Sequence, residues 1–258
     1  MNLPRARRIA YGDHVDQVGD LHLPAGDGPW PTVVLVHGGF WRLPWGLALM
    51  TPLARDLAGR GLAAWNIEYR RVGQAGGGWP GTLEDVAAAA DAVAGLDGVD
   101  ATRVVTVGHS AGGHLALWLA ARHRISPGAP GADPRVRPWA AVSQAGVADL
   151  AGGAAARLGS GACEALLGGS PADVPERYAA ASPLALLPLG VPQLLVHGDR
   201  DEAVPVGQSR AYATAARAAG DAVDLVELAD VNHLDLIEPE HPAWAAVVAW
   251  FGQFAPIE

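Results

Sequence analysis

Short runs of apolar residues recur along this chain, and turn residues such as glycine, proline and aspartate separate them. Runs that are apolar at every position suit strands buried on both faces, as in a parallel sheet covered by helices. The clearest runs are Thr32–Val36, Ala63–Ile67, Arg103–Val107, Ala140–Gln144 and Gln193–Val196. Segments with helical character alternate with them, namely Leu47–Gly59, Thr82–Leu96 and Gly112–His123. This alternation predicts a doubly wound α/β fold with a mostly parallel central sheet and helices on both faces.

Two stretches depart from this alternation. Apolar and polar residues are interspersed in Arg8–Leu23, which predicts an antiparallel hairpin at the N-terminal edge of the sheet. Residues 150–187 are rich in Gly, Ala and Pro and poor in bulky apolar residues. We therefore expect this segment to be an insertion above the sheet edge, or a small cap, within a single domain spanning residues 1–258. The length of 258 residues suits one α/β domain.

The ionisable residues narrow the possible chemistries. All 18 cationic residues are arginines, and the absence of lysine excludes a Walker A phosphate loop, a Schiff-base lysine and a Ser-Lys dyad. The formal net charge of −9 disfavours a nucleic-acid partner, because neutralising phosphates requires a basic surface. Cys163 is the single cysteine, so an intrachain disulfide and a cysteine-rich zinc site are both excluded.

Apolar stretches in this chain are short. Residues 1–20 lack the apolar core of a signal peptide, which is its defining feature. No run approaches the roughly 18 apolar residues that suggest a transmembrane helix. We therefore expect a cytoplasmic protein without a membrane partner.

The strongest local motif is Gly-x-Ser-x-Gly at residues 108–112, between a predicted strand and a predicted helix. In that setting the serine lies on a sharp, strained turn that exposes its hydroxyl above the strand end. Gly108 and Gly112 are required because a Cβ atom at either position would collide with neighbouring backbone. The amides at the start of the following helix favour negative charge near the serine. Ser110 is therefore the predicted nucleophile.

A glycine-rich turn also follows the first of the predicted strands. Its sequence, His37-Gly38-Gly39, allows backbone N–H groups to approach a substrate oxygen closely. We expect Gly38 and Gly39 to form an oxyanion hole together with the amide of Ala111, the residue after the predicted nucleophile. The amide of Phe40 is an alternative to that of Gly38.

An acid-rich turn follows the last of the predicted strands, where a carboxylate that orients a catalytic imidazole is expected. Asp199 and Asp201 compete for this role. We favour Asp201, which stands three residues after Gly198 and four before Pro205. Asp199 is then expected to brace the loop, and the neighbouring Glu202 to be a solvated charge.

The catalytic base is expected after the acid, because the triad of this fold follows the chain order Ser, Asp, His. Only His233 and His241 lie beyond Asp201. His233 stands in a short loop after the apolar run Val223–Leu228, 32 residues beyond Asp201, which leaves room for one helix, one strand and a loop. His241 precedes a proline and is expected to begin the last helix. His233 is therefore the predicted base.

The remaining histidines do not form a metal-binding pattern. His109 and His114 are five residues apart, which misses the i, i+4 spacing of metal-binding helices, and the motif His-Glu-x-x-His does not occur. We expect His37 and His197, at the ends of strands, to brace their loops. The sequence thus predicts catalysis without a metal or an organic cofactor.

The glycine-rich turn, the serine turn, the acid-rich turn and the histidine loop follow one another along the chain. In this order they resemble the motifs of the α/β-hydrolase superfamily over residues 20–255. The turns at residues 37–41 and 108–114 are similar to the esterase/lipase branch, which includes bacterial carboxylesterases, acetyl-xylan and feruloyl esterases, and kynurenine formamidases. Tyr69-Arg70 resembles a pair that braces the fold after the fourth strand of this branch. The resemblance implies a triad of Ser110, Asp201 and His233. The loop reads His-Gly-Gly-Phe-Trp rather than His-Gly-Gly-Gly, which favours the feruloyl-esterase-like or formamidase-like neighbours over hormone-sensitive-lipase-like esterases.

The resulting prediction is a serine carboxylesterase that acts on small to medium substrates through an acyl-enzyme. The alternatives are an arylformamidase acting on an N-formylkynurenine-type amide, and a non-catalytic binding protein on the same fold. The expected partner is a small-molecule ester or amide, and a homo-oligomer is possible. The chain has nine tryptophans against three phenylalanines. The aromatic residues expected near the pocket are Phe40, Trp41, Trp45 and Trp79, whereas Trp118 is expected in the core.

Overall fold

The computed structural model describes residues 6–252, which contain one eight-stranded sheet. The strand order across the sheet is β1-β2-β4-β3-β5-β6-β7-β8. Pairing is antiparallel between β1 and β2 and between β2 and β4, and parallel across the rest of the sheet. The strands are β1 Arg7–Ala10, β2 Val18–His22, β3 Trp30–Val36, β4 Ala63–Ile67, β5 Val99–His109, β6 Ala140–Gln144, β7 Gln193–Gly198 and β8 Val223–Leu228. The predicted parallel sheet with an antiparallel N-terminal edge is confirmed.

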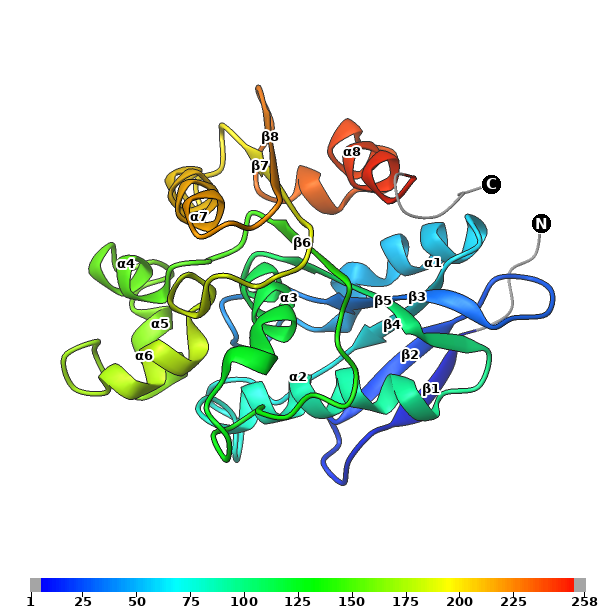
Figure 1. Cartoon of the computed structure of the whole chain (residues 1–258), viewed down its shortest axis with the longest axis horizontal. Coiled ribbons are helices and arrows are strands. Elements are labelled where there is room, and N and C mark those ends of the chain that lie inside the picture. Colours follow the sequence, from blue (N-terminus) through cyan, green and yellow to red (C-terminus); the bar gives the residue numbers. More distant parts are fainter. Residues whose placement is uncertain (1–5, 253–258) are drawn as a thin grey trace.

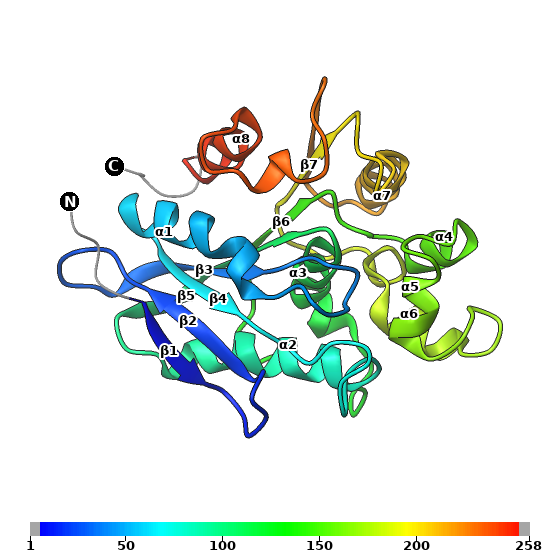
Figure 2. The ribbon, with the colours of Figure 1, turned by 180° about the vertical axis from the view of Figure 1, so that it is seen from behind.

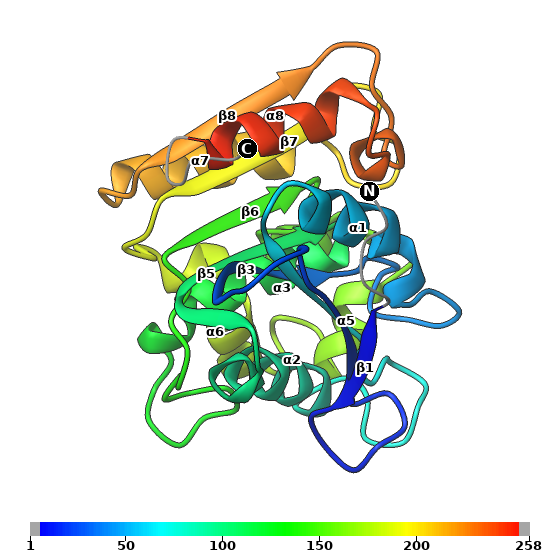
Figure 3. The same ribbon diagram turned by 90° about the vertical axis from the view of Figure 1, so that its right-hand side faces the viewer.

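Helices cover both faces of this twisted sheet (Figure 1). The α-helices are α1 Thr51–Gly59, α2 Gly81–Ala92, α3 Ala111–Ala121, α4 Leu150–Ala155, α5 Ala162–Leu167, α6 Pro175–Ala181, α7 Gly207–Ala218 and α8 Pro242–Phe251. The 3-10 helices are η1 Leu47–Met50, η2 Val93–Gly95, η3 Arg122–Arg124, η4 Pro183–Leu186 and η5 Asp235–Ile237. Figure 3 shows the sheet twisting from β1 to β8.

The core consists of two apolar clusters, one on each side of the sheet. Side chains of α1 and α8 share one cluster, whereas those of α2, α3 and α7 share the other. Strands β4 and β6 are buried at all their positions, as expected of strands covered by helices on both faces. Trp118, on α3, is fully buried, as predicted.

The segment 150–187 forms the short helices α4, α5 and α6 and the 3-10 helix η4, which lie together at one side of the sheet (Figure 2). Buried residues of these helices, including Cys163 and Leu166, belong to the same cluster as α2 and α3. Because this segment has no apolar cluster of its own, we propose that it is an insertion in a single domain. Its role as a cap stays a prediction.

No helix in residues 6–252 is long and apolar enough to cross a membrane. The parallel strands place their carboxyl ends along one edge of the sheet, which is where ligands bind in open α/β sheets. The turns after β3, β5, β7 and β8, which carry the residues singled out from the sequence, all begin at this edge.

Candidate active site

Ser110 occupies a one-residue turn between the end of β5 at His109 and the start of α3 at Ala111. Its backbone angles are φ 56° and ψ −122°, a conformation that a residue with a side chain adopts only under strain. A Cβ atom on Gly108 would lie 2.0 Å from the carbonyl oxygen of Gly112, so strand and helix meet at a distance that excludes side chains. The sharp turn predicted around Ser110 is present.

The Ser110 side chain lines a cavity, and the residue is almost fully buried. The Ser110 amide donates a hydrogen bond to the carbonyl oxygen of Gln144 on β6, at 2.8 Å. The hydroxyl oxygen makes no hydrogen bond with any residue in the described part of the chain. This oxygen is therefore not committed to a structural contact.

Asp201 and His233 form a close pair at the ends of β7 and β8. The Nδ1 atom of His233 lies 2.6 Å from Oδ2 of Asp201. The other carboxylate oxygen of Asp201 accepts hydrogen bonds from the amides of Ala203 and Val204, at 2.9 and 2.8 Å. A carboxylate only accepts when ionised, so Nδ1 carries the hydrogen and Nε2 of His233 is left to accept a proton.

The carboxylate of Asp201 is held in its ionised form. Burial by itself raises the pKa of Asp201, but hydrogen bonds from His197 and His233 outweigh burial and bring the pKa below its ordinary value. His197 lies 3.3 Å from Oδ2 of Asp201 and also contacts Ser209 and the carbonyl oxygen of Val204. His197 thus braces this loop, as the sequence suggested.

Asp199 is placed away from His233. Its Oδ1 atom accepts a hydrogen bond from the amide of Asp230 at 2.7 Å, which ties the turn after β7 to the turn after β8. This contact matches the bracing role expected for Asp199. Glu202, expected to be a solvated charge, is exposed but lies at the wall of the cavity next to the ion pair of Arg200 with Asp230.

His109, for which the sequence predicted no catalytic role, anchors the loop that carries His233. Its Nε2 atom lies 2.9 Å from the carbonyl oxygen of His233, and the two rings are 4.4 Å apart. Burial, reinforced by an electrostatic contribution from nearby His233, lowers the pKa of His109 to about 3. The neutral ring therefore donates through Nε2 to the carbonyl. The position directly before the nucleophile is the signal that could have identified this residue.

The predicted oxyanion loop lies directly against the serine turn. A Cβ atom on Gly38 would lie 2.9 Å from Cβ of Ser110, so the backbone of Gly38 is in close contact with the nucleophile. Gly39 lines the cavity and has φ +110°, a backbone angle that glycine adopts readily. Ala111 follows Ser110 as the first residue of α3. The structure thus brings Gly38, Gly39 and Ala111 together around Ser110.

A cavity of about 600 Å³ opens above Ser110. Its wall is mainly apolar, and the side chains of Trp45 and Leu234 at its mouth are 46% and 51% exposed. No residue of the 150–187 segment lines this cavity. The lining residues are Gly39, Phe40, Trp45, Leu49, His109, Ser110, Arg200, Glu202, Ala203, Asn232, His233 and Leu234.

Two of the four aromatic residues expected in the pocket lie elsewhere. Trp41 is fully buried in the core, where it packs edge-on against His114 at a ring distance of 5.3 Å. The amide of Trp79 donates to the carbonyl oxygen of Leu166, and its side chain packs against the core cluster to which buried residues of α5 belong. The prediction is therefore wrong for Trp41 and Trp79. Phe40 and Trp41 are the central residues of a turn in which the amide of Arg42 donates to the carbonyl oxygen of Gly39. Both have positive φ angles, which the local sequence does not reveal.

The described residues, 6–252, contain no group of three or more His, Cys, Asp or Glu side chains placed to hold a metal ion. His241 caps α8 by accepting a hydrogen bond from the amide of Ala243, as predicted. It takes no part in the cavity.

A parallel sheet, a strained serine turn and an Asp-His pair at the strand ends together define an α/β-hydrolase. The chain belongs to the BD-FAE family, which matches residues 20–215. A truncated carbohydrate esterase from gut microbiota shares this fold, with a TM-score of 0.83 over 97% of this chain and 96% of the other, at 19% identity.

Two named relatives share more of the sequence. Esterase LipQ of Mycobacterium tuberculosis is 30% identical over 79% of this chain and 50% of its own length. Esterase 2 of Thermogutta terrifontis, in a structure phosphoramylated by tabun, is 25% identical, with a TM-score of 0.77, and the match covers 98% of this chain and 95% of that one. The chain thus spans about half the length of the LipQ relative.

Proposed function

We propose that this protein is a serine hydrolase that cleaves carboxylic esters of small to medium size through an acyl-enzyme intermediate. The observation that carries the proposal is the convergence on one cavity of Ser110, on its strained turn, and of His233, paired at 2.6 Å with Asp201. Nucleophile, base and orienting acid are the three parts that such chemistry requires.

The proposed reaction begins when Nε2 of His233 takes the proton of Ser110 as the serine oxygen attacks the ester carbonyl carbon. Asp201 keeps the imidazole in the correct tautomer and stabilises its charged form. The amide of Ala111 and that of Gly39 or Gly38 bind the oxygen that becomes negative, and each such donor contributes about 2.7–4 kcal/mol in the transition state. The alcohol leaves with a proton from His233, and water then releases the acid by the same route.

The relatives and the cavity support esters as substrates. LipQ is named an esterase, and esterase 2 of Thermogutta terrifontis, 25% identical to this chain, has a structure with propionate bound. The apolar wall around Phe40, Trp45 and Leu234 suits an acyl chain or an aromatic group. A cytoplasmic location and a homo-oligomeric state stay predictions.

Hydrolysis of p-nitrophenyl esters with acyl chains of increasing length tests the proposal, with N-formylkynurenine measured alongside. We expect ester turnover by the wild type and none by Ser110→Ala. A fluorophosphonate probe should label the wild type and leave Ser110→Ala unlabelled. Turnover of the formamide faster by orders of magnitude would point to an arylformamidase, and an unlabelled wild type to a non-catalytic protein.

A further inference from the structure

The carboxylate of Glu68, directly after β4, connects the turn after β3, the start of η1 and the residue that follows it in the chain. Its Oε1 atom lies 2.7 Å from Nε2 of His37 and 3.1 Å from the amide of Tyr69. Its Oε2 atom accepts a hydrogen bond from the amide of Leu47 at 3.0 Å. Burial raises the pKa of Glu68, but the hydrogen bond with His37 and the other nearby donors outweigh burial, so the pKa is lowered.

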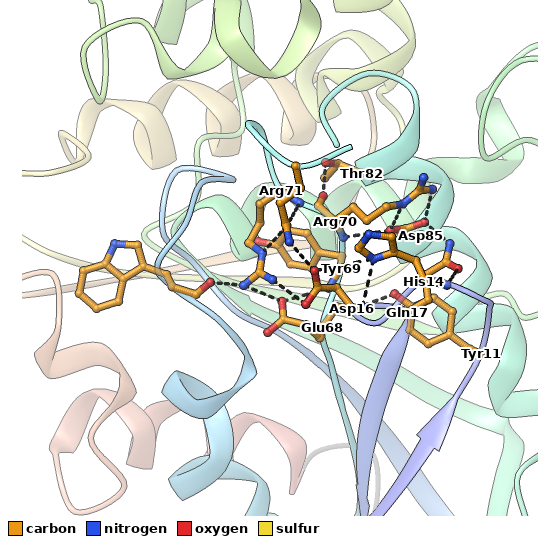
Figure 4. Close-up of polar contacts among 12 residues, drawn as sticks. Tyr11, His14, Asp16, Gln17, Glu68, Tyr69, Arg70, Arg71, Thr82 and Asp85 are labelled. Carbon is orange, nitrogen blue, oxygen red and sulfur yellow. Dashed lines mark hydrogen bonds and ion pairs between the residues drawn. The ribbon is translucent and has the colours of Figure 1, made fainter. Parts of the chain in front are cut away.

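An arginine extends this network toward the edge of the sheet (Figure 4). The guanidinium of Arg71 lies 3.3 Å from Glu68 and 2.9 Å from Asp16, on the turn between β1 and β2. It also donates to the carbonyl oxygen of Trp45 at 2.5 Å. Glu68 is therefore held in place from both sides, which gives His37 a fixed partner.

His37 is fully buried and links Glu68 to the oxyanion loop. Its Nδ1 atom lies 2.8 Å from the carbonyl oxygen of Gly38. A carbonyl oxygen only accepts, so Nδ1 must carry a hydrogen and donate it. The Nε2 atom makes the contact with the carboxylate of Glu68. Stacking on Tyr69, at a ring distance of 4.3 Å and an angle of 8°, fixes the plane of the imidazole.

The contact with the carbonyl oxygen of Gly38 determines the orientation of the next amide. The peptide bond between Gly38 and Gly39 is trans, and in a trans peptide the C=O and N–H groups point in opposite directions. When His37 holds the carbonyl oxygen on the buried side, the N–H of Gly39 points to the other side. Gly39 lines the cavity above Ser110, so that side is the cavity.

We propose that His37 is a positioning residue, which keeps the Gly38–Gly39 peptide oriented with the Gly39 amide toward the substrate oxygen. The inference rests on the proposed function, since an oriented amide serves catalysis only if Ser110 is the nucleophile. Glycine adopts positive and negative φ angles about equally readily, and Gly39 has φ +110°. The sequence of the loop alone therefore does not hold this peptide, and the hydrogen bond from His37 does.

Two substitutions of His37 separate this role from general bracing. In His37→Asn, the side-chain amide can donate from the position of Nδ1 and keep the contact with Gly38, while the contact with Glu68 is lost. In His37→Gln, the side-chain amide reaches the position of Nε2 and keeps the contact with Glu68, while the contact with Gly38 is lost. Both remove the stacked ring, so their melting temperatures should fall by similar amounts.

We expect kcat for a p-nitrophenyl ester to be about tenfold to hundredfold lower in His37→Gln than in His37→Asn, somewhat less than the loss of a whole oxyanion donor. KM should be the same in both variants, because the amide acts mainly in the transition state. The inhibition constant of a boronic acid, which forms a tetrahedral adduct with the serine, should be higher for His37→Gln by the same factor. Equal kcat values for the two variants, or a lower value for His37→Asn, would overturn the proposal.

Asp16→Asn provides the matched control, because it weakens the same network on the side away from the cavity. We expect its kcat and KM to equal those of the wild type, and a fall in kcat as large as that of His37→Gln would also overturn the proposal. Failure of the proposed function looks different. In that case the wild type and Ser110→Ala would be equally inactive toward esters, and neither would be labelled by the fluorophosphonate.

Discussion

The two sides of the cavity hold their functional groups in different ways. On the side of β5, Ser110 is positioned by backbone against backbone, with glycines where strand and helix touch. On the side of β3 and β4, the glycine loop is held by the buried side chains of His37 and Glu68. The glycines of the first arrangement lie in one five-residue motif, although its backbone also contacts Val36 and Gln144, whereas the second joins side chains 31 positions apart. A local motif therefore contains the nucleophile and the glycines of its turn, but the side chains that hold the facing amides come from distant positions.

Removal of the nucleophile should lower kcat more than any other substitution on either side of the cavity. Ser110→Ala deletes the attacking oxygen and leaves the backbone turn in place, so we expect kcat for p-nitrophenyl butyrate to fall by about 10⁴-fold or more. The melting temperature, measured by differential scanning fluorimetry, should change little. A variant that retains a rate near that of the wild type would mean that the serine turn has no chemical role.

Removal of the Asp201 charge should lower kcat nearly as strongly. Asp201→Asn removes the charge that fixes the tautomer of His233, and we expect kcat to fall by about 10³- to 10⁴-fold. Asp199→Asn is the matched control on the same turn, and its kcat should stay within about twofold of the wild type because a surface substitution there leaves the pair intact. The opposite order of the two effects would transfer the role to Asp199.

The close contact between Gly112 on α3 and the end of β3 should leave no room for a side chain. In Gly112→Ala, the new Cβ atom would lie 2.0 Å from the carbonyl oxygen of Val36, and we expect a loss of about 3 kcal/mol in the free energy of unfolding. Gly59→Ala is the control, because a Cβ atom there meets nothing within 4 Å. It should be neutral or stabilising by about 0.5 kcal/mol. Urea denaturation measures both, and similar stabilities would show that the turn can relax.

The contact between His109 and His233 should have a smaller effect, which is a change of the free energy of unfolding with pH. The pKa of His109 is lowered to about 3, against an ordinary value of 6.5. Between these two pH values the unfolded chain binds a proton that the folded chain does not. The free energy of unfolding therefore falls as the pH decreases below 6.5, by up to about 1.4 kcal/mol per pH unit.

His109→Gln isolates this contribution, since glutamine can donate from the position of Nε2 to the carbonyl oxygen of His233 without titrating. We expect the wild type to lose stability faster than His109→Gln between pH 6.5 and pH 4.5, measured by urea denaturation at several pH values. Parallel stability curves for the two proteins would mean that His109 is protonated as easily in the folded chain as in the unfolded one.

The sequence by itself determined the parallel sheet, the antiparallel edge and the serine turn, because each depends on patterns a few residues long. Apolar runs at every position require burial on both faces, and a Gly-x-Ser-x-Gly turn between strand and helix has few other structural solutions. Chain order limited the base to His233 or His241, and the loop position of His233 together with the proline after His241 favoured His233. The preference for Asp201 over Asp199 rested on spacing within one turn.

Tertiary structure decided which side chains meet. It paired Asp201 with His233 and left Asp199 bound to the amide of Asp230. It also placed Trp41 in the core while Trp45, four positions later, lines the cavity. The bond between His37 and Glu68 joins the ends of two neighbouring parallel strands. Such contacts depend on strand register and on the direction of each side chain, and both are determined only when the whole sheet has assembled.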